Sequence, residues 1–301
     1  MATAVLFTYG APALPALDTL SAAGATLAAV VVPGNRSGPA VDRVVDGAAR
    51  RGLPVWTQPP RSAIAPFVEQ LRGAAPDVCV VWSYSMLRPQ AVLDVPRHGT
   101  VNVHAGSLPG YRGGHVIQWA IINGEREAAA TLHYVDAGVD TGPVVAEVRF
   151  SIGDQDDADL VRERLQEAGL QLLREWWPRV AEGTAPRVAQ DESRARYWPL
   201  RTPEQGRIDW RRPAAEICRL VRALVSNDPG AFASCAGGSV LMVRRAQPVE
   251  WPQAPTAPGQ VLSVSAEGLL VAAGDGAVLV SDAILDGRRL AGLAFTEVVL
   301  D

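Results

Sequence analysis

Three residues whose side chains can take part in bond-making chemistry lie in the middle of the chain. Asn102 and His104 stand two apart in the run TVNVHA, and Asp140 follows in the turn DAGVDTG. If residues 100–105 form a strand, the side chains of Asn102 and His104 leave the same face of it. After His104 the chain enters a loop rich in glycine and proline, GSLPGYRGG. A strand that opens into such a loop is a common place for the site of an α/β protein.

Together these three side chains suit acyl transfer to an amine. The attacking amine must lose a proton, and His104 is the natural base because histidine titrates closest to neutral pH. The Asn102 amide can donate to the carbonyl oxygen on which negative charge develops. The Asp140 carboxylate can orient the imidazole and favour its charged form. Each residue also has an ordinary structural role, as a buried histidine, a strand-end amide or a turn aspartate, so spacing alone is weak support.

The same stretch resembles the signature of the folate-dependent formyltransferases, which move a formyl group from 10-formyltetrahydrofolate to an amine. The family pattern N-x-H matches residues 102–104, the loop pattern S-L-L-P-x-Y/W-R/K-G matches 106–113, and the D-x-G turn matches 140–142. The resemblance implies the three catalytic roles given above. One departure is that Gly106 and Ser107 stand where the family has serine and leucine. This departure predicts a loop that is more mobile or shaped for another acceptor.

The resemblance also implies where the folate co-substrate and the amine acceptor bind. The pterin ring is expected between the segment after Trp82 and residues 135–140, where apolar side chains pack on its faces and loop backbone groups bond its edge. The folate-binding residues predicted on this basis are Met86, Leu87, Arg88, Val135, Asp136, Val139 and Asp140. Those predicted to bind the acceptor are Ser107, Tyr111, Arg112, Gly113 and His115.

Length and composition set the outer limits of the interpretation. A chain of 301 residues with 48% hydrophobic and 20% charged residues is typical of a globular protein with one large and one smaller domain. No apolar run is long enough to span a bilayer, and the first residues lack the basic region of a signal peptide. The three cysteines show no metal-binding spacing. We therefore expect a cytoplasmic enzyme without a metal or a membrane partner; its oligomeric state is not predicted.

The first part of the chain alternates short apolar runs with helix-like periods. Strands are predicted at 4–9, 27–32, 54–57, 78–82 and 100–105, and helices at 14–23, 41–51 and 63–73. This alternation predicts an α/β, Rossmann-like domain with a mostly parallel sheet and helices on both faces. The first turn, residues 9–12, lacks the G-x-G-x-x-G pattern, which argues against a dinucleotide.

The second part of the chain predicts a separate, smaller domain. A long helix is expected at residues 157–177, and short alternating runs after residue 239, separated by turns, are typical of a small antiparallel barrel or sandwich. The stretches IDW…PGAF and PGQVL…GDG resemble the C-terminal domain of the family members that formylate methionyl-tRNA or aminoarabinose. The predicted domains are a catalytic domain at 1–190, a linker at 191–205 and a β-barrel-like, OB-like domain at 206–301.

The identity of the amine is the open question. The net charge of −4 and the pI of about 5.7 give no general attraction to nucleic acid. Residues 34–40, where the tRNA enzymes of the family carry a basic loop, hold one arginine, and phosphate binding depends on such charges. The first hypothesis is therefore N-formyl transfer to a small-molecule amine, such as a nucleotide-linked amino sugar or an amine of a peptide or natural product. Methionyl-tRNA is the alternative acceptor, and a 10-formyltetrahydrofolate hydrolase and a non-catalytic folate-binding protein are further alternatives.

Overall fold

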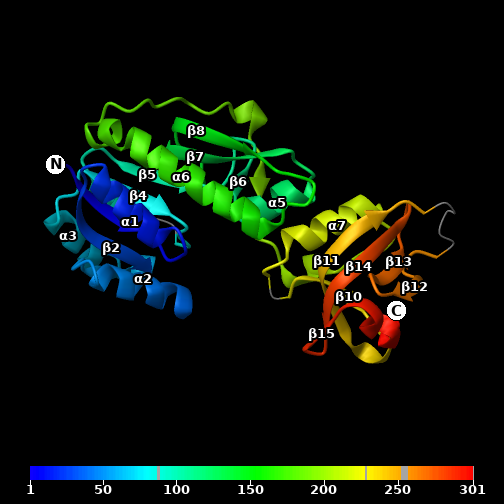
Figure 1. Cartoon of the computed structure of the whole chain (residues 1–301). Coiled ribbons are helices and arrows are strands. Elements are labelled where there is room, and N and C mark those ends of the chain that lie inside the picture. Colours follow the sequence, from blue (N-terminus) through cyan, green and yellow to red (C-terminus); the bar gives the residue numbers. More distant parts are fainter. Residues whose placement is uncertain (87–88, 228, 252–256, 301) are drawn as a thin grey trace. The chain divides into compact units, whose positions relative to one another are not determined.

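The computed structural model in Figure 1 describes residues 1–86, 89–227, 229–251 and 257–300 of the chain. The chain forms two compact units. The first contains Met1–Gly113, Ala128–Phe150 and Arg164–Tyr197, and the second contains Gly114–Glu127, Ser151–Glu163 and Trp198–Asp301. The units therefore interleave along the sequence. The predicted domain boundaries at 190 and 206 stay a prediction.

A seven-stranded sheet forms the centre of the first unit, in the order β3-β2-β1-β4-β5-β7-β8. Its strands are β1 (Thr3–Phe7), β2 (Thr26–Pro33), β3 (Val55–Gln58), β4 (Val78–Trp82), β5 (Thr100–His104), β7 (Glu127–Tyr134) and β8 (Val144–Ser151). The pairs from β3 to β5 are all parallel, and β7 pairs with β5 in the antiparallel sense. The predicted mostly parallel α/β sheet is confirmed.

Helices cover both faces of this sheet, which explains why β4, VCVVW, is buried at every residue. On one face, Phe67, Val68 and Leu71 of α3 (Ala65–Gly73) pack in a core cluster with residues of β1, β2 and β4. On the other face lies the part of α6 that belongs to this unit (Figure 1). A Cβ atom at Gly169 of α6 would lie 2.5 Å from the Trp82 ring, so the helix approaches the sheet closely.

The remaining helical elements of the first unit are α1 (Ala13–Ala22), α2 (Pro39–Ala49), the short α4 (Gln90–Leu93) and the 3₁₀ turns η1 (Arg61–Ala63) and η2 (Glu192–Arg194). Of these, α1 and α2 were predicted, and both are amphipathic. Helix α1 buries Ala13, Ala16, Leu17 and Leu20, the spacing of one helical face.

The long helix α6 (Ala158–Ala181) corrects one expectation about its end. The sequence predicts that the helix stops at Trp177, before a proline, yet Pro178 lies inside the helix. The next turn is held by packing, because Val180 is 1% exposed and Trp177 is 3% exposed. Burial of these side chains outweighs the hydrogen bond that a proline removes.

The second unit contains an antiparallel sheet in the order β10-β11-β14-β13-β12, with β15 paired to β14. Its strands are β10 (Ala231–Ser234), β11 (Val240–Val249), β12 (Val261–Ser265), β13 (Gly268–Ala272), β14 (Ala277–Leu285) and β15 (Arg288–Leu290). The other elements are α5 (Val116–Ile122), α7 (Ala214–Ala223) and the 3₁₀ turns η3 (Pro203–Gly206), η4 (Ala236–Gly238) and η5 (Gly292–Glu297). The two-residue strand β6 (Arg112–Gly113) lies in the first unit, and in β9 (Tyr197–Trp198) the first residue belongs to the first unit and the second to the second unit. The small antiparallel C-terminal domain is confirmed, although the short strands β10 and β15 were not predicted.

Among the described residues, no helix combines the length and the apolar character needed to cross a bilayer. Within those same ranges, no group of three or more His, Cys, Asp or Glu residues is placed to hold a metal ion.

Candidate active site

The antiparallel pairing of β5 with β7 gathers polar side chains on one face of the sheet. Asn102 is paired with His133, and His104 is paired with Thr131. Paired residues share a face, and so do residues two apart in one strand. The opposite face carries Val103, which lies under α6. The structure thus brings the predicted Asn102 and His104 together and adds His133 and Thr131, which are 1% and 0% exposed.

Asp140 is brought to the same face by the turn that follows β7. Its Oδ2 atom lies 3.6 Å from Nδ1 of His104 and accepts a hydrogen bond of 2.9 Å from the backbone N–H of Gly113. Its Oδ1 atom lies 3.7 Å from Nε2 of His133. The carboxylate therefore lies between two imidazoles. The predicted trio of Asn102, His104 and Asp140 is assembled in the structure.

The turn that carries Asp140 is held in an uncommon backbone conformation. Asp140 has a φ of 55°, in the left-handed region that aspartate tolerates better than most residues. A Cβ atom at Gly142 would overlap the carbonyl oxygen of Tyr134, so glycine is required there. The side-chain nitrogen of Gln190 donates to the carbonyl oxygens of Asp140 and Gly142, at 2.9 and 2.7 Å. Gln190 therefore stabilises the backbone of this turn at Asp140 and at Gly142.

Arg112, which was predicted to bind the acceptor, is buried and already fully bonded. Its guanidinium donates to Oε1 of Gln190 at 3.1 and 2.8 Å, to both carboxylate oxygens of Glu192 at 2.9 and 2.6 Å, and to the hydroxyl of Tyr197 at 2.9 Å. These bonds use all five N–H donors of an arginine. The hydrogen bond to Glu192 raises the pKa of Arg112 and lowers that of the glutamate. In this structure Arg112 supports Gln190 and all of its donors are used, and its role in binding the acceptor stays a prediction.

The imidazole of His104 is held at one ring nitrogen by the loop that follows β5. Its Nε2 atom lies 2.6 Å from the carbonyl oxygen of Tyr111. A carbonyl only accepts, so this nitrogen carries a proton. The other nitrogen, Nδ1, faces Asp140 at 3.6 Å, which is longer than a hydrogen bond. To accept a proton at Nε2, the neutral ring must give up its bond to Tyr111 and carry its own proton on Nδ1, the nitrogen that faces Asp140.

The departure from the family motif at Gly106 and Ser107 has a steric basis. A Cβ atom at Gly106 would lie 2.8 Å from Cβ of Tyr111 and 3.0 Å from its carbonyl oxygen. The loop that holds His104 is therefore folded too tightly for a side chain at position 106. The hydroxyl of Ser107 donates to Glu147 at 2.8 Å. The side chain of Ser107 is thus hydrogen-bonded to a residue of β8.

Of the other residues predicted to bind the acceptor, Tyr111 and Gly113 contact the proposed trio, whereas His115 lies in the second unit. Tyr111 is half-buried and contributes its carbonyl to His104, and Gly113 contributes its N–H to Asp140. His115 lies in the second unit, where it has a φ of 52° and its Nδ1 atom accepts a hydrogen bond from the backbone N–H of Arg201 at 3.0 Å. Tyr111 and Gly113 therefore act in this structure through their backbone.

The predicted folate residues lie on the segments after β4 and β7. Met86 and Val135 are half-buried, Asp136 is exposed, and Val139 is 45% exposed. Leu87 and Arg88 lie outside the described residues. An exposed apolar side chain beside exposed carboxylate and backbone groups fits a flat ring with donors at its edge.

Sequence reasoning missed the residues that surround the predicted trio. His133 stands in an ordinary apolar strand, LHY, and its position opposite Asn102 depends on the strand register. Gln190 and Glu192 lie some fifty residues beyond the turn that they support. The sequence shows that these polar residues are present, but it does not show which residues they contact.

Comparison with protein families finds two matches. Residues 37–176 match the family described as "Formyl transferase", and residues 201–297 match "Formyl transferase, C-terminal domain". The methionyl-tRNA formyltransferase of Myxococcus xanthus is 39% identical over 243 residues, which cover 81% of this chain and 76% of that protein. The enzyme of the same name from Citrifermentans bemidjiense is 35% identical over 284 residues, covering 92% and 87%.

Two solved structures show the same fold at lower identity. The N-formyltransferase of Helicobacter canadensis, solved with folinic acid and dTDP-3-aminofucose, has a TM-score of 0.70 at 16% identity and covers 93% of this chain and 99% of that one. HypX of Aquifex aeolicus, solved with tetrahydrofolic acid, has a TM-score of 0.63 at 22% identity and covers 99% of this chain and 48% of that one. From these matches, the chain belongs to the folate-dependent formyltransferases, an enzyme family whose formyl donor is 10-formyltetrahydrofolate.

Proposed function

We propose that this enzyme transfers the formyl group of 10-formyltetrahydrofolate to a primary amine, with Asn102, His104 and Asp140 around the reacting atoms. The observation that supports this most is the placement of the Asp140 carboxylate, 3.6 Å from His104, on the face of the sheet that also carries Asn102. A hydrogen-bond donor, an imidazole and a carboxylate are the groups that amine acylation requires.

Each of the three side chains has a distinct task in the proposed reaction. The amine nitrogen bonds to the formyl carbon, and the bond between that carbon and the folate nitrogen breaks. The Asn102 amide donates to the formyl oxygen while it carries negative charge. His104 takes the proton that the amine loses, and Asp140 stabilises the imidazolium that forms. The proton then leaves with the folate nitrogen, so the enzyme returns to its starting state.

For the acceptor, the comparisons favour the amino group of methionyl-tRNA. Curated relatives that are 34–39% identical to this chain bear the name methionyl-tRNA formyltransferase. The match extends over both units, since it includes the C-terminal family domain. We therefore propose methionyl-tRNA as the first acceptor to test, ahead of the small amine that the sequence favoured.

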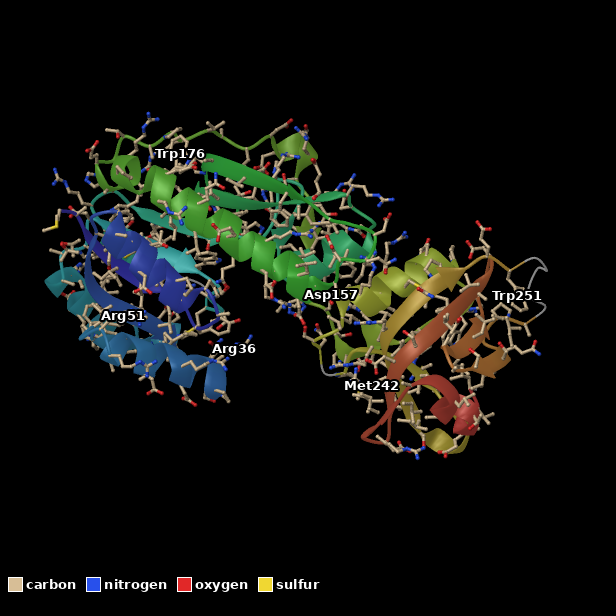
Figure 2. All side chains as sticks on the ribbon, in the orientation of Figure 1. Arg36, Arg51, Asp157, Trp176, Met242 and Trp251 are labelled. Carbon is tan, nitrogen blue, oxygen red and sulfur yellow. The ribbon has the colours of Figure 1, made fainter. Side chains whose placement is uncertain are left out.

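A small-molecule amine is the second candidate, because the charge distribution favours it. Arg36, which is labelled in Figure 2, is the one arginine in the segment between β2 and α2. Its guanidinium lies 5.4 Å from the centre of the Tyr9 ring. Phosphate binding draws on unpaired cations, and the net charge of the chain is −4.

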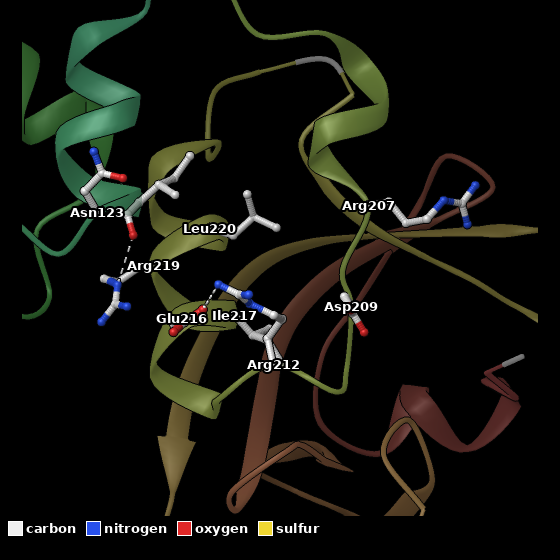
Figure 3. A pocket seen from close by; sticks show the side chains of 9 residues that line it. Asn123, Arg207, Asp209, Arg212, Glu216, Ile217, Arg219 and Leu220 are labelled. Carbon is white, nitrogen blue, oxygen red and sulfur yellow. Dashed lines mark hydrogen bonds and ion pairs between the residues drawn. The ribbon is translucent and has the colours of Figure 1, made fainter. Parts of the chain in front are cut away.

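The same scarcity of unpaired cations holds in a groove of the second unit. This groove, of about 450 Å³, is lined by Arg207, Arg212 and Arg219 together with Asp209 and Glu216 (Figure 3). Arg212 forms an ion pair with Glu216, Arg219 donates to the carbonyl oxygen of Ile122 at the end of α5, and Arg207 donates to Ser234. These arginines already have partners within the unit, which reduces their capacity to bind the phosphates of an RNA backbone.

The test is a formyl-transfer assay that compares acceptors. Release of tetrahydrofolate is followed by absorbance with methionyl-tRNA, deacylated tRNA, nucleotide-linked amino sugars, amino acids, small peptides or buffer, and the product is checked for a gain of one formyl mass. Transfer to methionyl-tRNA that weakens steeply with salt supports the first acceptor. Transfer to a small amine with little salt dependence supports the second. Equal release in buffer alone contradicts both and indicates a hydrolase.

A further inference from the structure

His133 is a buried imidazole at the site to which the proposed reaction gives no task. It lies in β7 opposite Asn102 and is 1% exposed. Its Nε2 atom is 3.0 Å from Nδ2 of Asn102 and 3.7 Å from Oδ1 of Asp140. A single ring nitrogen thus faces both the amide and the carboxylate of the proposed catalytic trio.

The backbone determines which nitrogen of His133 carries the proton in the neutral ring. Nδ1 lies 2.7 Å from the carbonyl oxygen of Tyr134. Because a carbonyl only accepts, Nδ1 is the protonated nitrogen and donates to it. Nε2 then presents a lone pair. It accepts one of the two N–H groups on Nδ2 of Asn102.

This bond determines what the Asn102 side chain can offer to a substrate. One N–H of the amide is used by His133, and the second remains for the formyl oxygen. If the amide turned over, its oxygen would face the lone pair of His133, and two acceptors at 3.0 Å repel each other. The amide nitrogen is therefore kept toward β7. An oxyanion donor works best when its orientation is fixed before the reaction.

We infer that His133 is a positioning residue that holds the Asn102 amide in its donating orientation through Nε2. The inference rests on the proposed function and names a further residue of the same site. The competing explanation is purely structural, with His133 filling space and anchoring the backbone through its bond to Tyr134. The two explanations assign the role to different ring nitrogens, and this difference can be tested.

Two substitutions separate the two nitrogens. In His133→Gln, the side-chain amide reaches the place of Nε2 and its oxygen can accept from Asn102. In His133→Asn, the shorter amide reaches the place of Nδ1 and can donate to Tyr134, but no atom replaces Nε2. Positioning of Asn102 predicts that glutamine is the better replacement. A structural role through Tyr134 predicts that asparagine is.

We expect His133→Asn to lower kcat by about 10- to 100-fold, since loss of an oxyanion donor typically costs 10²–10³ and the donor here is only misaligned. KM for the acceptor should stay within about twofold, because the amide acts on the reacting carbonyl. His133→Gln should keep kcat within about fivefold of the native enzyme. His98, which lies before β5 at the far end of the strand, provides the control, and His98→Asn should leave kcat unchanged.

A double-substitution cycle tests whether His133 acts through Asn102. Once Asn102→Ala has removed the amide, His133→Asn should cost no more than about twofold in kcat, because nothing is left to position. Thermal melting of every variant identifies those that fail to fold; if His133→Asn is among them, the ¹⁵N signal of His133 Nε2 in the native protein and in Asn102→Ala decides the inference in place of the cycle. Equal losses of kcat with and without Asn102 would overturn the inference, as would a better rate for asparagine than for glutamine.

A measurement on the resting protein keeps this inference separate from the proposed function. In protein labelled with ¹⁵N-histidine, the ring signals of His133 should show the tautomer protonated at Nδ1, and the Nε2 shift should move in Asn102→Ala but not in His98→Asn. An Nε2 shift that ignores Asn102 would overturn the inference even if the enzyme is active. If no amine is formylated by the native protein, the proposed function fails and the ¹⁵N result alone decides whether His133 holds Asn102.

Discussion

The side-chain amide of Gln190 donates to the carbonyl oxygen of Asp140 at 2.9 Å and thereby joins the segment after α6 to the turn that carries the proposed catalytic carboxylate. The other end of the same amide accepts from Arg112, a buried arginine whose remaining donors go to Glu192 and Tyr197. Positions far apart in the chain thus fix one backbone turn.

Replacing Gln190 with alanine should lower activity by loosening this turn. The substitution leaves the carbonyl oxygens of Asp140 and Gly142 without a donor and leaves two N–H groups of Arg112 unpaired, which costs about 1–3 kcal/mol for each buried group. We expect a lower melting temperature and a fall in kcat of about tenfold or more. The control is Gln171→Ala on α6, where the side chain bonds Glu175 in an exposed pair. Equal effects of the two substitutions would contradict the role of Gln190.

Replacing Arg112 with lysine should destabilise the first unit although the charge is kept. A lysine supplies one point charge with three donors in place of the five donors of the planar guanidinium. Each buried polar group that the lysine leaves without a partner costs about 1–3 kcal/mol. Chemical denaturation should show this loss. Unchanged stability would mean that the bonds to Gln190 and Glu192 contribute little.

Placing the family's serine at position 106 should disturb the loop that holds His104. The new Cβ atom would lie 2.8 Å from Tyr111, whose carbonyl oxygen accepts from the imidazole. Overpacking of this kind costs about 1–3 kcal/mol. Gly110→Ser is the matched control, since the nearest atom to a Cβ there is 3.9 Å away. We expect Gly106→Ser to melt earlier than Gly110→Ser, and the reverse order would show that the loop adapts.

Cys218 should resist alkylation in the folded protein. It lies on the buried face of α7, and burial raises the pKa of its thiol to about 12. The reactive thiolate is therefore about 10⁻⁴ of the population at pH 8. Peptide mass spectrometry after iodoacetamide treatment should find Cys218 unmodified in native buffer and modified in guanidinium chloride. Rapid modification in native buffer would show that α7 opens easily.

The sequence predicted those parts of the fold that depend on local patterns. The apolar run of β4, residues 78–82, was predicted with the observed bounds, and α1 was recognised from its periodicity within one residue at each end. The end of α6 was wrong, because the burial of Val180 depends on residues far away in the chain. The short β10 was missed, since four residues of AFAS carry little pattern of their own.

The proposed site was predictable in part for the same reason. Asn102 and His104 are two apart in a strand, and this local spacing alone puts them on one face. Asp140 was found by resemblance to a family motif. His133 was not found, because its place opposite Asn102 depends on an antiparallel register between β5 and β7 that no short motif encodes. The contacts of Arg112 were missed for a similar reason, since its partners lie about eighty residues further along.

The most direct measurement of the central claim compares formyl transfer by the native enzyme with transfer by His104→Ala and Asp140→Asn. Each protein is given 10-formyltetrahydrofolate and the acceptor that the native enzyme formylates, and the formylated product is quantified by mass. We expect both substitutions to lower kcat by about 10²-fold or more, while the melting temperature and the affinity for tetrahydrofolate are retained. Transfer at the native rate by either variant would contradict the proposed roles of His104 and Asp140.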